Sequence, residues 1–241
     1  MRLNNGLMLL SLMVATVGFW NRNALPPAAS ILPLLDVDPV QDRTINRAFA
    51  VDWKGREYRI EPKFGYELTG LVVSYRLHDG ENSRMHRRSD DHLNAADLCV
   101  VWGNNARIPE LGEYKFRSGV FTCFWTYRSR AAGQRFNEQQ ISNNHLLTDD
   151  PEIRREISRV RIGDQIRLSG VLAEYMSPNG SRRGTSTTRT DTGDGACETI
   201  YLNQFEIIKR EISPWRWAWW LGSLMLLITL IVHFRTPHRA R

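Results

Sequence analysis

Apolar residues gather at the two ends of the chain. The stretch from Trp215 to Phe234 carries one charge near its start, and it has the roughly twenty residues that a helix needs to cross a bilayer. Tryptophans crowd its first turns, as expected at a membrane interface. Gly6 to Trp20 is 15 residues long, which suits a signal-peptide core and is short for a span. We predict a transmembrane helix at 213–234 and an uncleaved signal anchor or transmembrane helix at 1–22, with a cleaved signal peptide as the alternative.

Between these ends the pattern changes to short runs with alternating apolar residues, typical of strands. One stretch, Asp150 to Arg159, reads instead as a short helix, with Asp150 as cap and Pro151 in its first turn. We therefore predict a mainly β domain at 48–212, a small barrel or sandwich with one short helix, for which an OB-like barrel is one form. Residues 23–47 show no clear period and are expected to be a linker. The strand-like runs are 49–53, 58–60, 66–77, 98–103, 119–127, 162–175 and 198–208.

Charge separates the ends from the middle. The net charge is +6, with 32 Lys and Arg against 26 Asp and Glu. Six arginines lie in 1–22 and 215–241, which contain no acidic residue, so the middle of the chain is formally neutral. A neutral domain lacks the positive field that binds a phosphate backbone, so no nucleic-acid partner is expected. The bilayer and other membrane or periplasmic proteins are the expected partners.

The basic tail at 235–241 predicts a cytoplasmic C-terminus under the positive-inside rule. Lys209, Arg210 and Arg216, on the other side of the last apolar stretch, favour the reverse orientation. The export-like N-terminal segment decides between them. We expect a protein of the bacterial inner membrane whose main domain is periplasmic.

The chain has three cysteines. Cys99 and Cys123 lie in the middle of predicted strands, and neighbouring antiparallel strands would bring them to bridging distance. We predict a disulfide between them, with two buried free thiols as the alternative. No CxxC or Cys/His ligand spacing is present, so neither a metal site nor a cofactor is expected.

Two polar stretches occur where strand or helix signals would be expected, at 142–150 and 185–198. His145 in the first is a candidate general base, oriented by Asp149 or Asp191, or else a structural histidine that ties a loop to the helix start. Asp191-Thr-Gly193 matches the triplet of aspartic proteases, but a second copy is missing. The catalytic candidates are His145, Asp191 and Glu198; the ligand-binding candidates are Asn144, His145, Ser186, Arg189, Asp191 and Asp194.

Four pieces of the chain carry a resemblance: Asp97-Leu-Cys-Val-Val-Trp-Gly, Ser142-Asn-Asn-His-Leu-Leu, Gly163-Asp-Gln-Ile-Arg-Leu-Ser-Gly, and Ser186-Thr-Thr-Arg-Thr-Asp-Thr-Gly-Asp-Gly-Ala-Cys-Glu. Together they resemble an uncharacterised family of bacterial membrane-anchored proteins over roughly residues 66–208. The resemblance implies a membrane-anchored domain and assigns no activity to any residue.

Three functional hypotheses follow. The leading one is a membrane-tethered extracytoplasmic binding or assembly module without enzymatic activity. The second is a membrane-anchored hydrolase that uses His145 with Asp191 or Glu198. The third is an OB-type nucleic-acid binder on the cytoplasmic face, with aromatic strand residues stacking on bases.

Overall fold

The computed structural model describes residues 2–43, 47–78, 90–109, 111–193 and 196–236. It divides into two compact units, which are treated separately. One is formed by residues 25–211, and the other combines residues 1–24 with residues 212–241.

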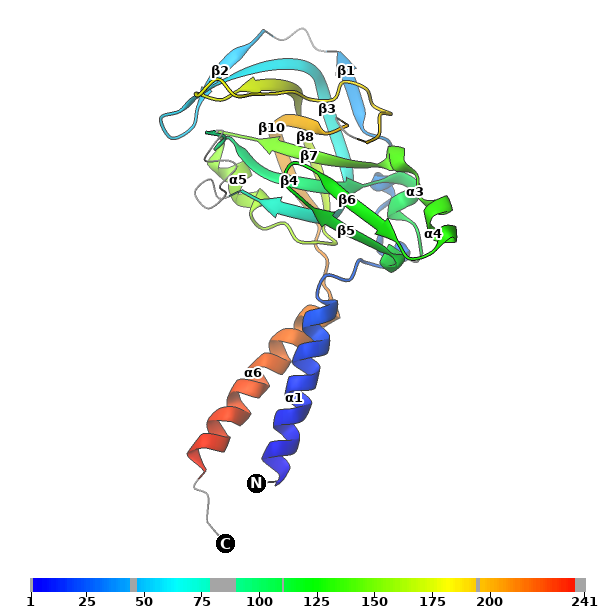
Figure 1. Cartoon of the computed structure of the whole chain (residues 1–241), viewed down its shortest axis with the longest axis vertical. Helices are drawn as coiled ribbons and strands as arrows, with labels where there is room; N and C mark the ends of the chain where they lie inside the picture. Colours follow the sequence, from blue (N-terminus) through cyan, green and yellow to red (C-terminus); the bar gives the residue numbers. More distant parts are fainter. Residues whose placement is uncertain (1, 44–46, 79–89, 110, 194–195, 237–241) are drawn as a thin grey trace. The chain divides into compact units, whose positions relative to one another are not determined.

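The larger unit is built on a mixed eight-stranded sheet that is partly closed into a ring (Figure 1). The long strand β3 pairs with β4 through its second half and with β8 through its first, which brings the two ends of the strand order together. The pair β7 and β10 is parallel and the remaining pairs are antiparallel. The ring strands are β3 (Glu57–Leu77), β4 (Asn94–Val101), β7 (Ile141–Leu147), β10 (Glu198–Lys209) and β8 (Gln165–Met176), in that order.

Three short strands extend the sheet beyond the ring. They are β1 (Val40–Arg43), β2 (Phe49–Asp52) and β9 (Arg182–Arg183). The turn from β2 into β3 places Lys54 at φ 55° and Gly55 at φ 76°. Two successive positive φ angles are the signature of a tight hairpin turn whose twist matches the strands, so β2 and β3 form a hairpin.

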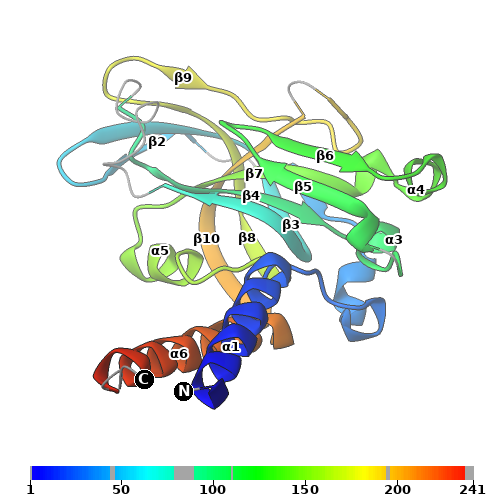
Figure 2. The same ribbon diagram turned by 60° about the horizontal axis from the view of Figure 1, so that its bottom comes forward.

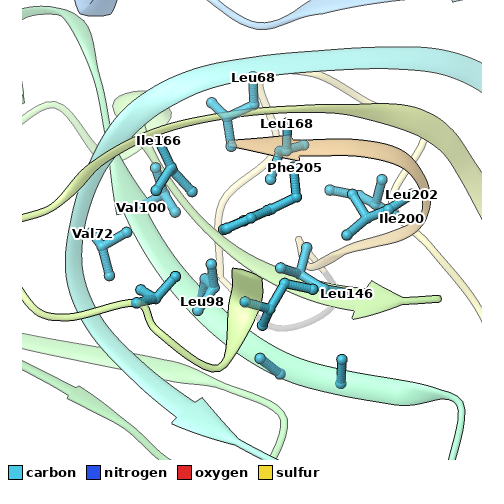
Figure 3. Close-up of a cluster of buried hydrophobic side chains, with 14 of the residues drawn as sticks. Leu68, Val72, Leu98, Val100, Leu146, Ile166, Leu168, Ile200, Leu202 and Phe205 are labelled. Atoms are coloured by element: carbon cyan, nitrogen blue, oxygen red, sulfur yellow. The ribbon is translucent and has the colours of Figure 1, made fainter. Parts of the chain in front are cut away.

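The interior of the ring holds the largest core cluster (Figure 3). Alternate residues of each strand point inward, as the period of two requires. Leu98 and Val100 of β4 meet Leu146 of β7 and Ile200 of β10. Gly170 sits where β8 approaches β10, and an added Cβ would lie 2.2 Å from the carbonyl oxygen of Tyr201. The glycine is therefore needed for the close approach of these two strands.

A separate hairpin of β5 (Tyr114–Ser118) and β6 (Cys123–Tyr127) packs beside the ring, where β5 contacts β3 and β4 (Figure 2). The predicted disulfide between Cys99 and Cys123 is present. The expected reason was wrong, because Cys99 pairs with strands β3 and β7, whereas Cys123 belongs to the hairpin. The bridge thus joins two sheets instead of two neighbouring strands.

The predicted helix is α5 (Pro151–Ile157), and the side chain of Asp150 caps it by accepting from the amides of Glu152 and Ile153. The expectation of a single short helix is wrong. Two further short helices flank the hairpin, α3 (Gly103–Ala106) and α4 (Arg130–Arg135). A helix of four to six residues is too short to show a period of 3.6 in the sequence.

The segment 23–47, expected to be a linker, is in large part packed against the domain. Its two 3₁₀ turns, η1 (Ala28–Ser30) and η2 (Pro33–Asp36), bring Ile31 and Leu35 into a second core cluster with Val101. Most of the segment at 78–95, in which no strand-like run was predicted, lies outside the described residues, although β4 begins within it at Asn94.

The smaller unit consists of α1 (Arg2–Asn21) and α6 (Pro214–Arg235), which run antiparallel and pack together. Both are long and apolar enough to cross a membrane. Small residues allow the close approach, since a Cβ on Gly18 would lie 2.4 Å from the amide of Trp219 and one on Gly222 would lie 2.6 Å from the amide of Ala15. Small residues at such contacts are typical of helices that associate in lipid.

Candidate functional site

Strand β7 carries the first predicted polar stretch, and its alternation divides the candidates between two faces. Asn144 points into the ring, on the same side as Leu146. His145 points to the opposite side. The register of β10 repeats this division, because Glu198 pairs with Asn144 and Thr199 pairs with His145. His145 and Glu198 therefore lie on opposite faces of the sheet.

The partner of His145 is Asp97, on the neighbouring strand β4. The two residues are paired across β4 and β7, and His145 Nδ1 lies 2.6 Å from Asp97 Oδ1. Asn94 donates to the same oxygen at 3.0 Å. His78 Nε2 lies 3.1 Å from the other oxygen, Oδ2. The carboxylate is fully buried and is flanked by two imidazoles.

The neighbours of Asp97 and His145 determine the protonation state of both groups. Burial raises the pKa of Asp97, but the hydrogen bonds and positive charge of His145 and His78 outweigh it and hold the pKa well below its usual range. Burial likewise lowers the pKa of His145, and its interactions with Asp97 and Cys197 overcome that effect and raise the pKa to about 9. At neutral pH the pair is a carboxylate and an imidazolium.

Cys197 lies on the same face as His145 and interacts with it. It is the free cysteine and is partly exposed. Its Sγ receives a hydrogen bond from Asn143 Nδ2 at 3.7 Å and donates to the carbonyl oxygen of Phe121 at 3.7 Å. Asp97 and His145 are therefore directly paired, and Cys197 lies beside them with Phe121 in contact with both His145 and the thiol.

The loop between β5 and β6 covers these residues. The ring of Phe121 packs edge-on against His145 with a centroid distance of 5.8 Å, and the guanidinium of Arg183 lies 3.5 Å from the Phe121 ring centre. Phe121 has φ 59°, a left-handed conformation that is unfavourable for a bulky residue. Such strain persists where the surroundings enforce it, often at functional sites.

The opposite face holds a different carboxyl group. Glu198 is buried inside the ring, and its Oε2 has no hydrogen-bond partner among the described atoms. Burial raises its pKa to about 8, against the opposing effects of its own backbone amide and of Arg189. Nearby, Asp191 accepts from the Ser186 hydroxyl at 2.6 Å, and Arg189 stacks over the Trp102 ring at 4.6 Å.

The predicted catalytic set does not meet as one acid–base group. His145 pairs with Asp97 instead of Asp191, Asp149 or Glu198, and Asp149 accepts from Tyr201. Asp194 lies outside the described residues. Asp97, His78 and Cys197 were missed, although a charged residue within the apolar run Ala95–Val101 was a usable signal for Asp97.

The predicted absence of a metal ligand cluster remains a prediction. Among the described residues no group of three or more His, Cys, Asp or Glu side chains is arranged to hold a metal ion. Two of the aromatic strand residues that could have stacked on bases pack within the protein instead. Trp102 is fully buried, and Trp125 packs on Phe136.

A cavity of about 240 Å³ opens on the far side of His78. The β2–β3 turn, the facing ends of β3 and β4, and helix α5 form its walls. Among the described residues its polar lining is cationic or imidazole-bearing apart from Ser158, and none of them that lines it is acidic. The lining residues are Trp53, Lys54, Arg56, Leu77, His78, His92, Ala95, Arg154, Ile157 and Ser158.

Arg154 is the anchor of this cavity. Its Nη2 donates to the backbone oxygens of His92, Leu93 and Thr148 at 2.8–3.1 Å, and its guanidinium lies 4.4 Å from the Trp53 ring centre. Burial lowers its pKa to about 10, which still leaves it cationic at neutral pH. Nearby Asp90 pairs with Arg56 and His92 and offsets part of the charge.

Comparison with known proteins adds no assignment. No family model, no curated protein and no solved structure matches the chain.

Proposed function

We propose that this protein is a membrane-tethered extracytoplasmic binding module, and that its ligand is an anion with an apolar body. The observation that carries the proposal is the cavity at Arg154, whose described lining combines three cationic side chains with apolar walls and contains no acid. Ligand sites are typically concave, largely apolar and supplied with a few placed polar groups. A carboxylate or phosphate attached to a small apolar group meets both features.

We further propose that the β domain is an OB-like barrel, and two observations support this: its strand order and the position of the cavity. The ring order β3, β4, β7, β10, β8, with α5 between β7 and β8, fits that arrangement. OB-like barrels bind ligands with the loops at one edge, including the loop between their first two strands. The corresponding loop here, between β3 and β4, supplies His78 and His92 to the cavity.

Binding to simple probes tests the proposal. The full-length protein in neutral detergent micelles is titrated by calorimetry with benzoate and phenyl phosphate, and with neutral benzamide as an isostere. We expect binding of at least one anion that is about tenfold tighter than that of benzamide, which corresponds to a difference of about 1.4 kcal/mol. Equal binding of benzamide, or none of any probe, would refute an anion site.

Lys54→Glu reverses one lining charge and is expected to weaken anion binding severalfold, because Lys54 is exposed at the cavity mouth beside Trp53. Lys115→Glu is the matched control. Lys115 is an exposed lysine on β5 and does not line the cavity. If both variants lose the same affinity, the effect is one of overall charge and the cavity is not the site.

The location of the domain belongs to the same proposal. The disulfide favours an oxidising compartment. If α1 and α6 both cross the membrane, their antiparallel packing puts the two termini on one side and the β domain on the other. We propose the bacterial inner membrane, with the β domain in the periplasm and the basic tail in the cytoplasm.

Labelling of cells with an intact inner membrane tests this topology. In a Cys197→Ser background, Lys115→Cys is expected to react with a membrane-impermeant maleimide. Thr236→Cys, beyond α6, is expected to react only after the inner membrane is broken. The reverse pattern would place the β domain in the cytoplasm.

A further inference from the structure

We propose that Cys197 is the nucleophile of an acyl-transfer site, with His145 as its acid–base partner and Asp97 as the positioning residue. Cys197, His145 and Asp97 do not line the cavity, although His78 lines it and also contacts Asp97. The proposal rests on geometry: Asp97 Oδ1 lies 2.6 Å from His145 Nδ1, and Phe121 contacts both of the other groups, because its ring packs on His145 and its carbonyl oxygen lies 3.7 Å from Cys197 Sγ. A carboxylate that orients one ring nitrogen while the ring faces a thiol is the arrangement of thiol-dependent acyl transferases and hydrolases.

The strand register makes this arrangement a fixed part of the fold. Asp97 and His145 are direct partners across β4 and β7, and Cys197 directly precedes β10, whose first residue, Glu198, pairs with Asn144. Two central strands therefore hold the acid–base pair, and the thiol lies one residue before a third strand. Rigid strands position reacting groups more precisely than loops do.

Two side chains near Sγ suit a nucleophilic role. Asn143 Nδ2 supplies a hydrogen-bond donor at 3.7 Å, and His145 lies under the same Phe121 whose carbonyl oxygen faces Sγ. A cation beside a thiol promotes the reactive thiolate. The titratable groups that act on His145 besides Asp97 are His78, through Asp97, and Glu198 from the opposite face.

The thiol is also free to react. The other two cysteines are joined to each other, so Cys197 has no cysteine left in the chain with which to form a stable bridge. Cys197 is partly exposed, whereas His145 and Asp97 are buried. A reagent therefore meets the sulfur first and the acid–base partner behind it.

The chemistry that this chain can perform is hydrolysis or transfer of an ester or thioester acyl group. The Cys197 thiolate attacks the acyl carbon, an S–C bond forms, and the bond to the leaving group breaks as His145 gives the leaving group its proton. Water then attacks the thioester: its hydroxyl joins the acyl carbon, its second proton returns to His145, and the thiolate leaves. Each turnover consumes one water and restores the starting pair.

Two readouts on the full-length protein in detergent micelles test the proposal. The first is the rate at which iodoacetamide alkylates Cys197 at pH 7. The second is the yield of an acetyl adduct on Cys197 after brief exposure to p-nitrophenyl acetate. Both are quantified by mass spectrometry of the Cys197 peptide. We expect rapid alkylation and a trapped acetyl adduct in the wild type.

His145→Gln is expected to slow alkylation by about tenfold or more, because the positive charge beside the sulfur is lost, and to abolish the acetyl adduct. Lys115→Gln is the matched control. It removes one positive charge from an exposed position on β5 that does not line the cavity and is not a hydrogen-bond partner of Cys197. Equal rates in the wild type and His145→Gln would overturn the proposal, as would equal losses in His145→Gln and Lys115→Gln. Alkylation without any acetyl adduct would overturn the acyl-transfer step.

Asp97→Asn tests the positioning role. Without the carboxylate the imidazole loses its proton more easily, so alkylation is expected to fall more at pH 8 than at pH 6. A purely structural role would lower the rate equally at both values. Each variant must retain the Cys99–Cys123 bridge, confirmed by non-reducing peptide mapping. If mapping finds Cys197 bridged in the wild type, the thiol is not free and the proposal fails.

Discussion

The two faces of the sheet formed by β4, β7 and β10 carry buried carboxyl groups of opposite character. Asp97 lies outside the ring and Glu198 lies inside it, and both are almost entirely shielded from solvent. The pKa of Asp97 is held well below its usual range, whereas the pKa of Glu198 is raised to about 8. Burial acts in the same direction on both groups. The difference therefore comes from their partners.

Asp97 has His145 and His78 within 3.1 Å and receives a hydrogen bond from Asn94. Glu198 has one oxygen without a partner among the described atoms, and Arg189 acts on it as a charge without an ion pair in the described structure. A buried carboxylate is tolerated when cations and donors surround it, and otherwise the group takes up a proton. One face thus holds a charge, and the other holds a neutral acid.

Asp97→Asn is expected to have the largest effect on stability. The change leaves two buried imidazoles without their counter-charge, and removing one partner from a buried ionic group costs about 3–5 kcal/mol. Thermal and urea unfolding of the full-length protein in detergent micelles, followed by far-UV circular dichroism, measures the loss. Asp36→Asn is the control, since Asp36 pairs with Arg107 at the surface and should tolerate the change. A loss as small as that of the control would mean that the network is not stabilising.

Removal of the disulfide comes next. The bridge closes a loop with a sequence separation of 24 residues, for which chain entropy predicts a loss of about 3.5 kcal/mol. The double variant Cys99→Ala, Cys123→Ala should show it by the same unfolding measurement. Because Cys123 follows the loop that carries Phe121, the change should also speed hydrogen exchange near His145 while leaving strand β8, on the far side of the ring, unchanged. Uniform loss of protection would contradict the local role.

The sequence predicted the parts of this comparison that depend on local pattern. The strands around β8 and β10, the cap of α5 by Asp150 and the pair Cys99–Cys123 follow from alternation, turn chemistry and cysteine count. His145 was also found, because a histidine among amides is unusual. Strand β7 was not predicted as a strand, since its inward residues Ser142 and Asn144 are polar.

The partners of His145 also could not be predicted from local pattern. Its pairing with Asp97 depends on the register of β4 against β7, and its contact with Cys197 depends on the parallel entry of β10. Both are contacts between residues about fifty positions apart, which local pattern does not encode. Asp191 looked like the better partner because it lies in a conspicuous polar motif, but it accepts from Ser186 instead.

Glu198→Gln should separate the two faces by pH. A carboxyl group with a raised folded-state pKa leaves stability unaffected below the unfolded value and reduces it as the pH rises toward the folded value. From the ordinary glutamate pKa of 4.5 to about 8, the protein therefore loses stability with rising pH, by up to about 1.4 kcal/mol for each pH unit. Glutamine removes this dependence, so the stability of Glu198→Gln relative to the wild type should increase from pH 5 to pH 8. Glu152→Gln, at an exposed site on α5, is the control.

The contribution of His145 to stability also falls as the pH rises, but over a different pH range. Its folded-state pKa is raised from 6.5 to about 9, so its contribution is complete below 6.5 and is lost as the pH rises through 9. The pH dependence that remains in Glu198→Gln above pH 6.5 is therefore assigned to His145. If the stability of Glu198→Gln did not change with pH above 6.5, His145 would not be an imidazolium at neutral pH.

The smallest effects come from the charges around Glu198, and their signs are opposite. Arg189 lowers the pKa of Glu198 and Asp191 raises it. Arg189→Gln should therefore move the pH at which the stability slope levels off to a higher value, and Asp191→Asn should move it to a lower one. Neither change should alter the profile assigned to His145, because both residues act on the inner carboxyl group. Shifts of the same sign in both variants would mean that loop rearrangement, and not charge, sets the protonation of Glu198.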